Sequence, residues 1–251
     1  MKDPSTSKTT DILQGILSTI KEDQPVRDIH VCIYWTAVTS LRCGLASSMA
    51  AFMTPSDEPQ VKKAGNLLPV DSKTLADLSL SSHILEASIG LAAINSALDL
   101  DESRFQELNA EDELKLRGEG KRMAVIGHFP FINRLRSVVK HMCVFELPGR
   151  ERPGDLEEDK LNSLIPQAEV VAISSTTLIN HTLGKILELV NPQSYTILLG
   201  PSTPLSPKLF DYGFDALSGS IVVHRSQVLR CICQGANFRQ IRGIRKVTFR
   251  R

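Results

Sequence analysis

Four consecutive hydroxyl side chains stand where an apolar segment ends. Residues 174–177 follow the apolar residues 170–173. Hydroxyls and the free N–H groups of a helix N-terminus both donate hydrogen bonds to anions. One helix cap uses one hydroxyl, so four exceed what capping needs, although capping alone accounts for any one of them. The pattern predicts a site for phosphate, carboxylate or another oxygen-rich anion, lined by Ser174, Ser175, Thr176, Thr177, Ser202 and Thr203.

Glycine and proline residues occur in the turns that are expected to form this site. Gly127 and Gly200 each end an apolar segment, where a Cβ would hinder a sharp turn or the close approach of a ligand. Pro130 and Pro207 suit the first turn of a following helix. These turns are therefore expected to be rigid and accessible to a ligand.

His128 and Glu146 are the residues near these turns that suit acid/base work or metal coordination. Glu146 ends an apolar segment, a position from which a carboxylate can also hold a ribose diol. The GxGxxG pattern is absent, and Phe129 and Pro130 stand where a pyrophosphate would lie, which disfavours NAD and S-adenosylmethionine. His181 is a further metal candidate without diagnostic spacing. The remaining histidines are expected to be structural: His30, His83, His141 and His224.

Hydrophobic periodicity predicts the elements that position these residues. After residue 118, apolar runs recur every 20 to 30 residues with helical runs between them, which indicates a parallel, doubly wound sheet. The carboxyl ends of such strands share one edge, so the turns are expected to form one cleft. The expected strands are 122–127, 142–147, 169–175, 195–200 and 216–223, and the expected helices are 130–139, 155–167, 177–190, 206–213 and 225–234.

The first part of the chain shows helices and strands in separate runs, which is typical of an α+β domain. A helix is expected at 11–22, and an antiparallel hairpin is expected from 28–40 and 42–52. Asp71 or Ser72, Ser82 and Asn109 are candidate N-caps for three further helices. The expected fold is therefore α/β, with an α+β domain at 1–118 and a parallel-sheet domain at 119–251, divided near Gly118.

Composition disfavours several classes of partner. The 251 residues include 29 Lys and Arg against 28 Asp and Glu, so no overall field attracts nucleic acid or an anionic membrane. The basic residues 238–251 are interpreted as a solvated tail or a last strand. No signal peptide or membrane-length apolar run occurs, so a soluble, cytoplasmic protein is expected. Five scattered cysteines fit reduced thiols, and Cys231 and Cys233 make a poor metal clamp.

Several strings of the sequence together resemble one family. They are "IGLAAINSAL", "AVIGHFPFINRL", "VFELPGRERPGD", "SSTTLINHTL" and "LLGPSTPLSPKLFDYGFDALSG". The resemblance is to the DUF364 family, whose label is "putative heavy-metal chelation". It implies an N-terminal domain like the small domain of enolase, a Rossmann-like C-terminal domain, and an active site between them. The motif positions that it implies are Asn95, Gly127, Phe129, Pro130, Glu146, Thr176, Thr177, Asn180, Gly200, Pro201, Ser202, Thr203 and Gly219.

The chain departs from the family pattern at two places. The family's TGTT is replaced by residues 174–177, with Ser175 in place of glycine, which narrows the room for an anion. Asn180 is followed by His181 where glycine is usual, so a ligand role for His181 would be particular to this chain.

These features predict a small-ligand-binding protein with a role in heavy-metal chelation and a cleft between its domains. The alternative is an enzyme, either a lyase, transferase or synthase acting on a small anionic substrate, or one that uses a nucleotide or S-adenosylmethionine. A transition metal is the candidate cofactor, the partner is a small anionic ligand or metal chelate, and a homo-oligomer is compatible with the sequence. The expected donors are Thr176, Thr177 and Ser202, the orienting residues Asn95 and Asn180, and the acid/base or metal residues His128 and Glu146.

Overall fold

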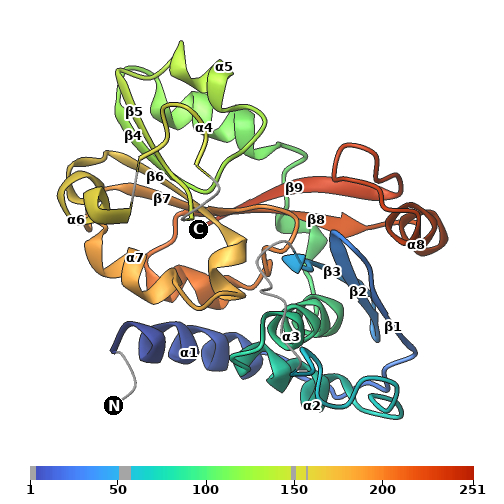
Figure 1. Ribbon diagram of the computed structural model, residues 1–251. Helices are drawn as coiled ribbons and strands as arrows, with labels where there is room; N and C mark the ends of the chain where they lie inside the picture. The colour runs from blue at the N-terminus through green and yellow to red at the C-terminus, as the bar shows by residue number, and fades with distance from the viewer. Residues whose placement is uncertain (1–3, 51–57, 148–150, 157) are drawn as a thin grey trace.

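Two β-sheets with helices around them form the structure, a computed structural model that describes residues 4–50, 58–147, 151–156 and 158–251 (Figure 1). One sheet has three antiparallel strands, and the other has six strands that are mostly parallel. The predicted α/β architecture is confirmed. No helix in the described ranges has the length and apolar character needed to span a membrane.

The three-stranded sheet comes from the first part of the chain and packs against a buried helix. At Gly44 an added Cβ would lie 2.2 Å from the Ala92 carbonyl oxygen, so the strand and the helix approach as closely as backbone allows. The elements of this part are α1 (Pro4–Leu17), β1 (Asp28–Val31), β2 (Trp35–Thr39), β3 (Cys43–Ser47), α2 (Ser72–Ala76), α3 (Ile84–Ala97) and α4 (Ala110–Gly118).

Residues 28–40 were expected to form one strand, and that prediction is wrong. A turn at Cys32 divides the segment into β1 and β2, closed by a hydrogen bond from the Cys32 N–H to the Trp35 carbonyl. Ile33 and Tyr34 are exposed at its tip, so an apolar run here marks a turn instead of a buried strand. Residues 51–52 of the expected second strand lie outside the described ranges.

The six-stranded sheet has the order β5-β4-β6-β7-β8-β9. All neighbouring pairs are parallel except the last, so the basic C-terminal segment is an antiparallel edge strand. This order places a topological switch point between β4 and β6, where ligands bind in doubly wound sheets. The strands are β4 (Arg122–Ile126), β5 (His141–Phe145), β6 (Val170–Ser174), β7 (Tyr195–Leu199), β8 (Ala216–Val222) and β9 (Ile244–Arg250).

Helices cover both faces of this sheet (Figure 1). On one face α4 and α5 (Ile132–Arg136) bury Leu114 and Leu135 against the strands. On the other face lie α6 (Leu161–Leu164), α7 (Leu183–Leu189) and α1. Helix α5, which connects β4 to β5, thus lies on the opposite face from α6 and α7, which follow β5 and β6. This change of face opens the crevice between β4 and β6.

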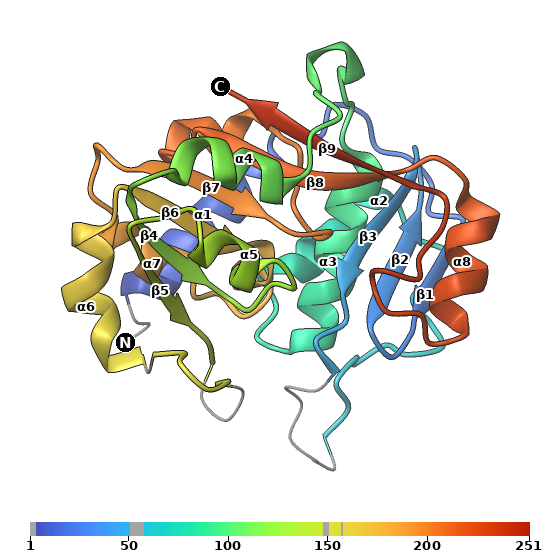
Figure 2. The same cartoon turned by 90° about the horizontal axis from the view of Figure 1, so that it is seen from above.

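Helices α1 and α8 (Arg225–Cys233) are among the elements that connect the three-stranded sheet and its helices to the six-stranded sheet. Helix α1 runs beside α7, and the Thr9 hydroxyl donates to the His181 carbonyl and accepts from the Gly184 N–H. Helix α8 packs on the three-stranded sheet, burying Val228 and Ile232 against Trp35 (Figure 2). The division near Gly118 stays a prediction.

The expected helix at 177–190 is interrupted. A 3-10 turn at Ser175–Leu178 is followed by a break before α7 begins at Leu183. His181 causes the break because its φ of +58° lies in the left-handed region, which no regular helix uses. The hydrophobic spacing continues through this segment, so periodicity alone could not show it.

Candidate functional site

A small cavity opens at the switch point between β4 and β6. Its volume is about 80 Å³, and we call it the hydroxyl cavity. It lies at the carboxyl ends of three parallel strands, where the turns carry polar side chains. Its lining consists of Ile126, Gly127, Phe145, Glu146, Leu147, Leu161, Ser174, Thr176, Thr177, Asn180, Thr182, Lys185 and Ile186.

The hydroxyls of this cavity are partly bonded to one another. Ser174 Oγ and Thr176 Oγ1 are 2.8 Å apart, and the Thr177 hydroxyl donates to the Ser174 carbonyl at 2.7 Å. Two hydroxyls that share one hydrogen bond retain one O–H group for another acceptor. The Ser174–Thr176 pair therefore has a donor left for a ligand, whereas the Thr177 proton is already used within the turn.

Ser175 points away from this cavity, toward β7. Its side chain is 1% exposed, and its hydroxyl is among the few buried polar atoms of the described residues without a hydrogen-bond partner. An added Cβ on Gly200 would lie 2.9 Å from Ser175 Oγ, so the glycine leaves the hydroxyl just enough room. An unpartnered buried hydroxyl costs ~1–3 kcal/mol, so the Ser175 side chain is less favourable for the fold here than a side chain without a hydroxyl.

Gly127 keeps the β4 and β6 turns close together. Its φ is +98°, a value that L side chains rarely adopt, and an added Cβ would lie 2.9 Å from Ser174 Cβ. Glycine is therefore required at this position both by its backbone conformation and by the space available.

Glu146 and His128 join neighbouring turns. One Glu146 carboxylate oxygen accepts from the His128 N–H at 3.1 Å, and the other accepts from the Leu147 N–H at 2.8 Å. His128 Nδ1 lies 3.1 Å from the carboxylate of Asp155, whose side chain is 1% exposed and also accepts from the Arg152 N–H. A carboxylate that orients an imidazole through Nδ1 leaves Nε2 to exchange protons, which is an acid/base arrangement.

Asp155 was not identified from the sequence. It lies ten residues beyond the end of β5, in a loop whose Leu156 pairs with Phe145. The only available signal was its place at the end of the string "VFELPGRERPGD".

A second, larger cavity lies beside the end of β7 and the middle of β8. Its volume is about 430 Å³, and we call it the aromatic cavity because Phe129, Phe131 and Phe238 contribute to it. The rings of Phe129 and Phe131 are stacked with centroids 5.3 Å apart. The rest of the lining is Asn109, Ala110, Glu111, Pro130, Arg134, Leu199, Gly200, Pro201, Ser218, Gly219, Arg239, Lys246 and Val247.

Cationic side chains border this aromatic surface. Lys246 Nζ lies 5.3 Å from the centroid of the Phe238 ring, and Arg239 is a further cationic residue of the lining. Arg134 is paired with Glu111, and its two hydrogen bonds hold the pKa of that carboxyl at about 2. The cavity suits a planar or apolar molecule that carries negative charge.

Asn95 and Ser202 join the two sheets, and neither these two residues nor Thr203 line a cavity. Asn95 Nδ2 donates to the Leu45 carbonyl and to the Ser202 carbonyl, at 2.8 and 3.1 Å. The Ser202 hydroxyl accepts from the Ser47 N–H, and the Thr203 hydroxyl donates to the Gly200 carbonyl. The bonds of Asn95 and Ser202 therefore connect the two sheets, and the bond of Thr203 stabilises the turn after β7.

His181 and Asn180 have local roles in the break before α7. His181 Nε2 lies 2.9 Å from the Ser81 carbonyl oxygen, which fixes the imidazole against the turn before α3. The Asn180 side-chain oxygen accepts from the N–H and the hydroxyl of Thr182. The positive φ of His181 explains why glycine suits this position.

The donor groups do not fit a resident metal ion. Within the described ranges, no group of three or more His, Cys, Asp or Glu side chains is arranged to hold one. Of the two predicted ligands, Glu146 uses both oxygens on backbone amides, and His128 has Nδ1 directed at Asp155.

Known families match both parts of the chain. The family model DUF364, described as "Putative heavy-metal chelation", matches residues 112–251. A second model with the same description, DUF4213, matches residues 14–98. An uncharacterized protein of Methanocaldococcus jannaschii is 31% identical over 157 residues, which are 59% of this chain and 60% of that protein. The chain thus matches less than two thirds of that relative's length.

Two crystal structures are similar over nearly the whole chain. A protein of unknown function from the DUF364 family of Desulfitobacterium hafniense DCB-2 has a TM-score of 0.82 at 25% identity, covering 98% of this chain and 99% of its own. Another protein of unknown function from the same family, from Pyrococcus horikoshii, has a TM-score of 0.78 at 19% identity, with 97% and 99% covered. The second likeness shows the fold alone.

Proposed function

The chain belongs to the DUF364 family, and from this premise we propose that it binds a small, oxygen-rich anionic ligand at the carboxyl edge of the six-stranded sheet. The observation that carries the proposal is the hydroxyl cavity at the switch point between β4 and β6. Ligands of doubly wound sheets bind in this crevice. Hydroxyls and backbone amides there suit carboxylate or phosphate oxygens.

The ligand that we propose is a metal chelate, in which the chelator's own atoms hold the metal. Thr176 donates to an oxygen of the chelator, and Lys185, which also lines the cavity, supplies positive charge nearby. Hydroxyls and ammonium groups are poor ligands for a transition metal but good partners for the carboxylates of a chelator. The family description of heavy-metal chelation supports this choice of ligand class.

A thermal-shift screen tests the proposal with phosphate, citrate, and the iron(III) and nickel(II) complexes of citrate. We expect a concentration-dependent rise in Tm with at least one chelate, because a ligand of the native state adds RT ln(1 + [L]/Kd) to its stability. Thr176→Val should reduce this rise while the Tm without ligand changes little. A Thr176→Val variant that responds to each compound as the wild type does would contradict the proposed site.

An acid/base enzyme is the second candidate, and the His128–Asp155 pair is the observation that favours it. A buried carboxylate that orients an imidazole is the arrangement of general acid/base catalysis, as a lyase, transferase or synthase requires. A nucleotide or S-adenosylmethionine enzyme has less support, because both Glu146 oxygens already accept from backbone amides.

One variant, His128→Asn, distinguishes the binding proposal from the catalytic proposal. A compound that stabilises the wild type is incubated with it, and its chemical change is followed by mass spectrometry. Under the enzyme proposal His128→Asn abolishes the change but retains binding. An unchanged compound after long incubation with wild-type protein favours binding alone.

A further inference from the structure

Two thiols from distant parts of the chain meet outside both cavities. Cys32 follows β1, Cys233 ends α8, and their Sγ atoms are 3.7 Å apart although 201 positions separate them in the sequence. The contact arises because α8 packs on the three-stranded sheet. Cys233 is exposed and Cys32 is half-buried, so one thiol of the pair is open to solvent.

From this geometry we propose that Cys32 and Cys233 form a reversible disulfide bond, and that the pair is a site of oxidative modification. A disulfide has an S–S length of ~2.05 Å, so the sulfur atoms must approach each other by only about 1.7 Å. Cys233 is the last residue of α8 and Gly235 follows with a φ of +78°, so the helix end can adjust without disturbing its buried face.

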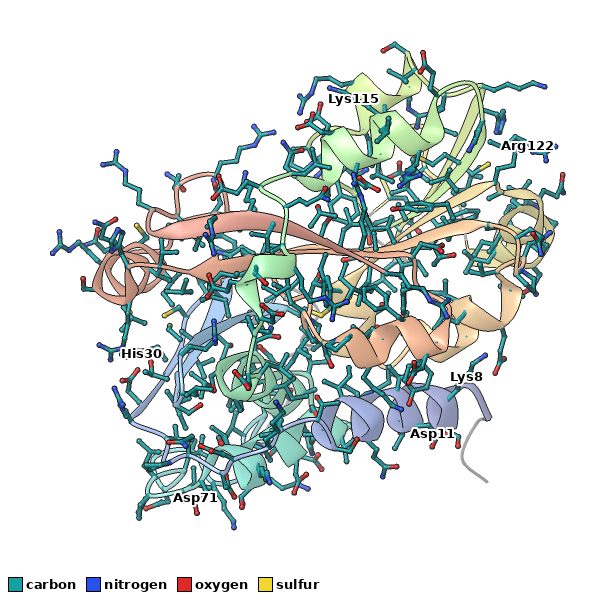
Figure 3. All side chains as sticks on the ribbon, turned by 180° about the vertical axis from the view of Figure 1, so that it is seen from behind. Lys8, Asp11, His30, Asp71, Lys115 and Arg122 are labelled. Atoms are coloured by element: carbon teal, nitrogen blue, oxygen red, sulfur yellow. The ribbon has the colours of Figure 1, made fainter. Side chains whose placement is uncertain are left out.

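The neighbours of Cys233 suit it to react first. His30 Nδ1 lies 4.0 Å from Cys233 Sγ, and His30 Nε2 lies 3.3 Å from the Asp28 carboxylate. His30 projects from the edge of the three-stranded sheet that α8 covers (Figure 3). A neutral imidazole here accepts the thiol proton, and the Asp28 carboxylate stabilises the imidazolium that results. Cys233 thus becomes the thiolate that attacks an oxidant.

Cys32 is the partner that completes the bond. Burial, the hydrogen bond to Cys233 and the charge of Cys233 together raise the pKa of the Cys32 thiol to about 11. Cys32 therefore keeps its proton while Cys233 is the thiolate. Once Cys233 is bonded to another sulfur, its charge is gone, and two of the three causes that hold the Cys32 proton disappear with it.

The oxidant that we name is a low-molecular-weight disulfide such as oxidised glutathione. The Cys233 thiolate attacks one sulfur, the S–S bond breaks, and one glutathione thiolate leaves. Cys32 then gives its proton to solvent, attacks the Cys233 sulfur, and expels the second glutathione thiolate. Each glutathione thiolate takes up one proton, which balances the two protons that the protein thiols lose. The net reaction converts two protein thiols and one disulfide into one protein disulfide and two glutathione thiols, so no other co-reactant is needed.

The disulfide would lie beside a segment that reaches the aromatic cavity. The Trp35 indole N–H donates to the Ala236 carbonyl at 3.0 Å, and the Trp35 and Phe238 rings lie 5.6 Å apart. Phe238 and Arg239 line that cavity. The bond therefore fastens the start of this segment to the three-stranded sheet. The inference stands on the thiol pair and does not depend on the proposed ligand.

The test incubates the folded protein in glutathione buffers of increasing oxidised fraction, blocks the remaining thiols, and maps the peptides by mass spectrometry. We expect the wild type to lose two of its five thiols and to give a peptide linked through Cys32 and Cys233, which dithiothreitol reverses. Cys32→Ser should stop at a glutathione adduct on Cys233. His30→Asn should slow the loss of thiols.

Cys231→Ser is the matched control, because Cys231 lies on the same helix and is not part of the pair. It should oxidise as the wild type does. Retention of all five thiols, linkage through Cys231, or a disulfide between two copies of the chain on a non-reducing gel would overturn the proposal. So would a Cys32→Ser variant that forms no adduct on Cys233.

Discussion

The two cavities at the carboxyl edge of the six-stranded sheet are built in different ways. Most of the hydroxyl cavity comes from turns that directly follow β4, β5 and β6, within a few residues of each strand end. The aromatic cavity combines α4, α5, the turns after β4 and β7, two residues within β8, and C-terminal residues between 238 and 247. The first therefore depends on local turn geometry, and the second depends on contacts between distant segments.

Because the cavities are built differently, different substitutions should damage each of them. A change in turn conformation should affect the hydroxyl cavity, whereas a lost contact between α4 and the C-terminal strand should affect the aromatic cavity. Ligand responses of paired variants can therefore show which cavity contributes to binding.

The largest effect is expected from Glu113, which connects the walls of the aromatic cavity. Its side chain is 0% exposed and accepts from Arg250 on β9, Arg117 and the Tyr195 hydroxyl. Burial raises the pKa of Glu113, but the hydrogen bonds from Arg250, Tyr195 and Arg117 outweigh it and leave the pKa lowered. Glu113→Gln removes the charge that pairs both arginines, so it should cost on the order of 3 kcal/mol.

Urea unfolding measures this cost, with Asp211→Asn as the control. The Lys208–Asp211 pair is exposed, and pairs of that kind contribute ~0–1 kcal/mol. If both variants lose the same small amount, the Glu113 network does not support the cavity walls.

The next effect in size concerns Gly127 in the hydroxyl cavity. Gly127→Ala places a Cβ 2.9 Å from the Ser174 side chain at a φ of +98°, so it should cost at least the ~1–3 kcal/mol of a strained backbone. Gly65→Ala is the matched control, because its φ of +82° is similarly strained and its added Cβ meets nothing within 4 Å. Equal unfolding free energies for the two variants would show that the Ser174 contact adds no cost.

The sequence was sufficient for the parts of the molecule that local patterns determine. Apolar runs with β-branched residues predicted the five parallel strands, which place Gly127 and residues 174–177 at one edge of the sheet; that these residues form a ligand site stays a prediction. Parallel strands in a doubly wound sheet must bring those turns to one edge, so the inference needed no long-range information.

Long-range contacts account for what the sequence did not show. Phe238 and Lys246 reach the aromatic cavity only because β9 pairs with β8, and Asp155 reaches His128 only through a loop beside β5. The sequence predicted only that Cys231 and Cys233 make a poor metal clamp, whereas the thiol in contact with Cys233 is Cys32, from the other end of the chain. Periodicity and spacing carry no information on such pairs.

A smaller effect is expected from the Glu111–Arg134 pair in the aromatic cavity. Hydrogen bonds from Arg134 hold the pKa of Glu111 at about 2, below its ordinary value of 4.5. The pKa of Glu111 is lower in the folded state than in the unfolded state. The ion pair with Arg134 therefore contributes its full stabilisation above the ordinary pKa, and this stabilisation is lost as the pH falls through the folded pKa. The difference in urea midpoint between wild type and Arg134→Gln should be constant above pH ~5 and shrink toward pH ~2. A difference independent of pH would contradict the ion pair.

The smallest change in stability, and the sharpest comparison, is expected from two neighbouring hydroxyls. Thr177→Val leaves the Ser174 carbonyl without its donor and should cost about 1 kcal/mol. Ser175→Ala removes a buried hydroxyl that has no partner, so it should leave the free energy of unfolding unchanged or raise it by a few tenths to about 1 kcal/mol.

Binding should treat the same two variants alike. Ser175 points away from the hydroxyl cavity and the Thr177 proton serves the turn, so Ser175→Ala and Thr177→Val should both retain the rise in Tm that a ligand confers on the wild type, whereas Thr176→Val should reduce it. Urea unfolding without ligand and thermal shifts with phosphate and citrate chelates supply the two measurements. A Ser175→Ala variant that keeps its free energy of unfolding and loses the ligand response would mean that binding uses the hydroxyl between β6 and β7, and would contradict the proposed use of the Ser174–Thr176 pair.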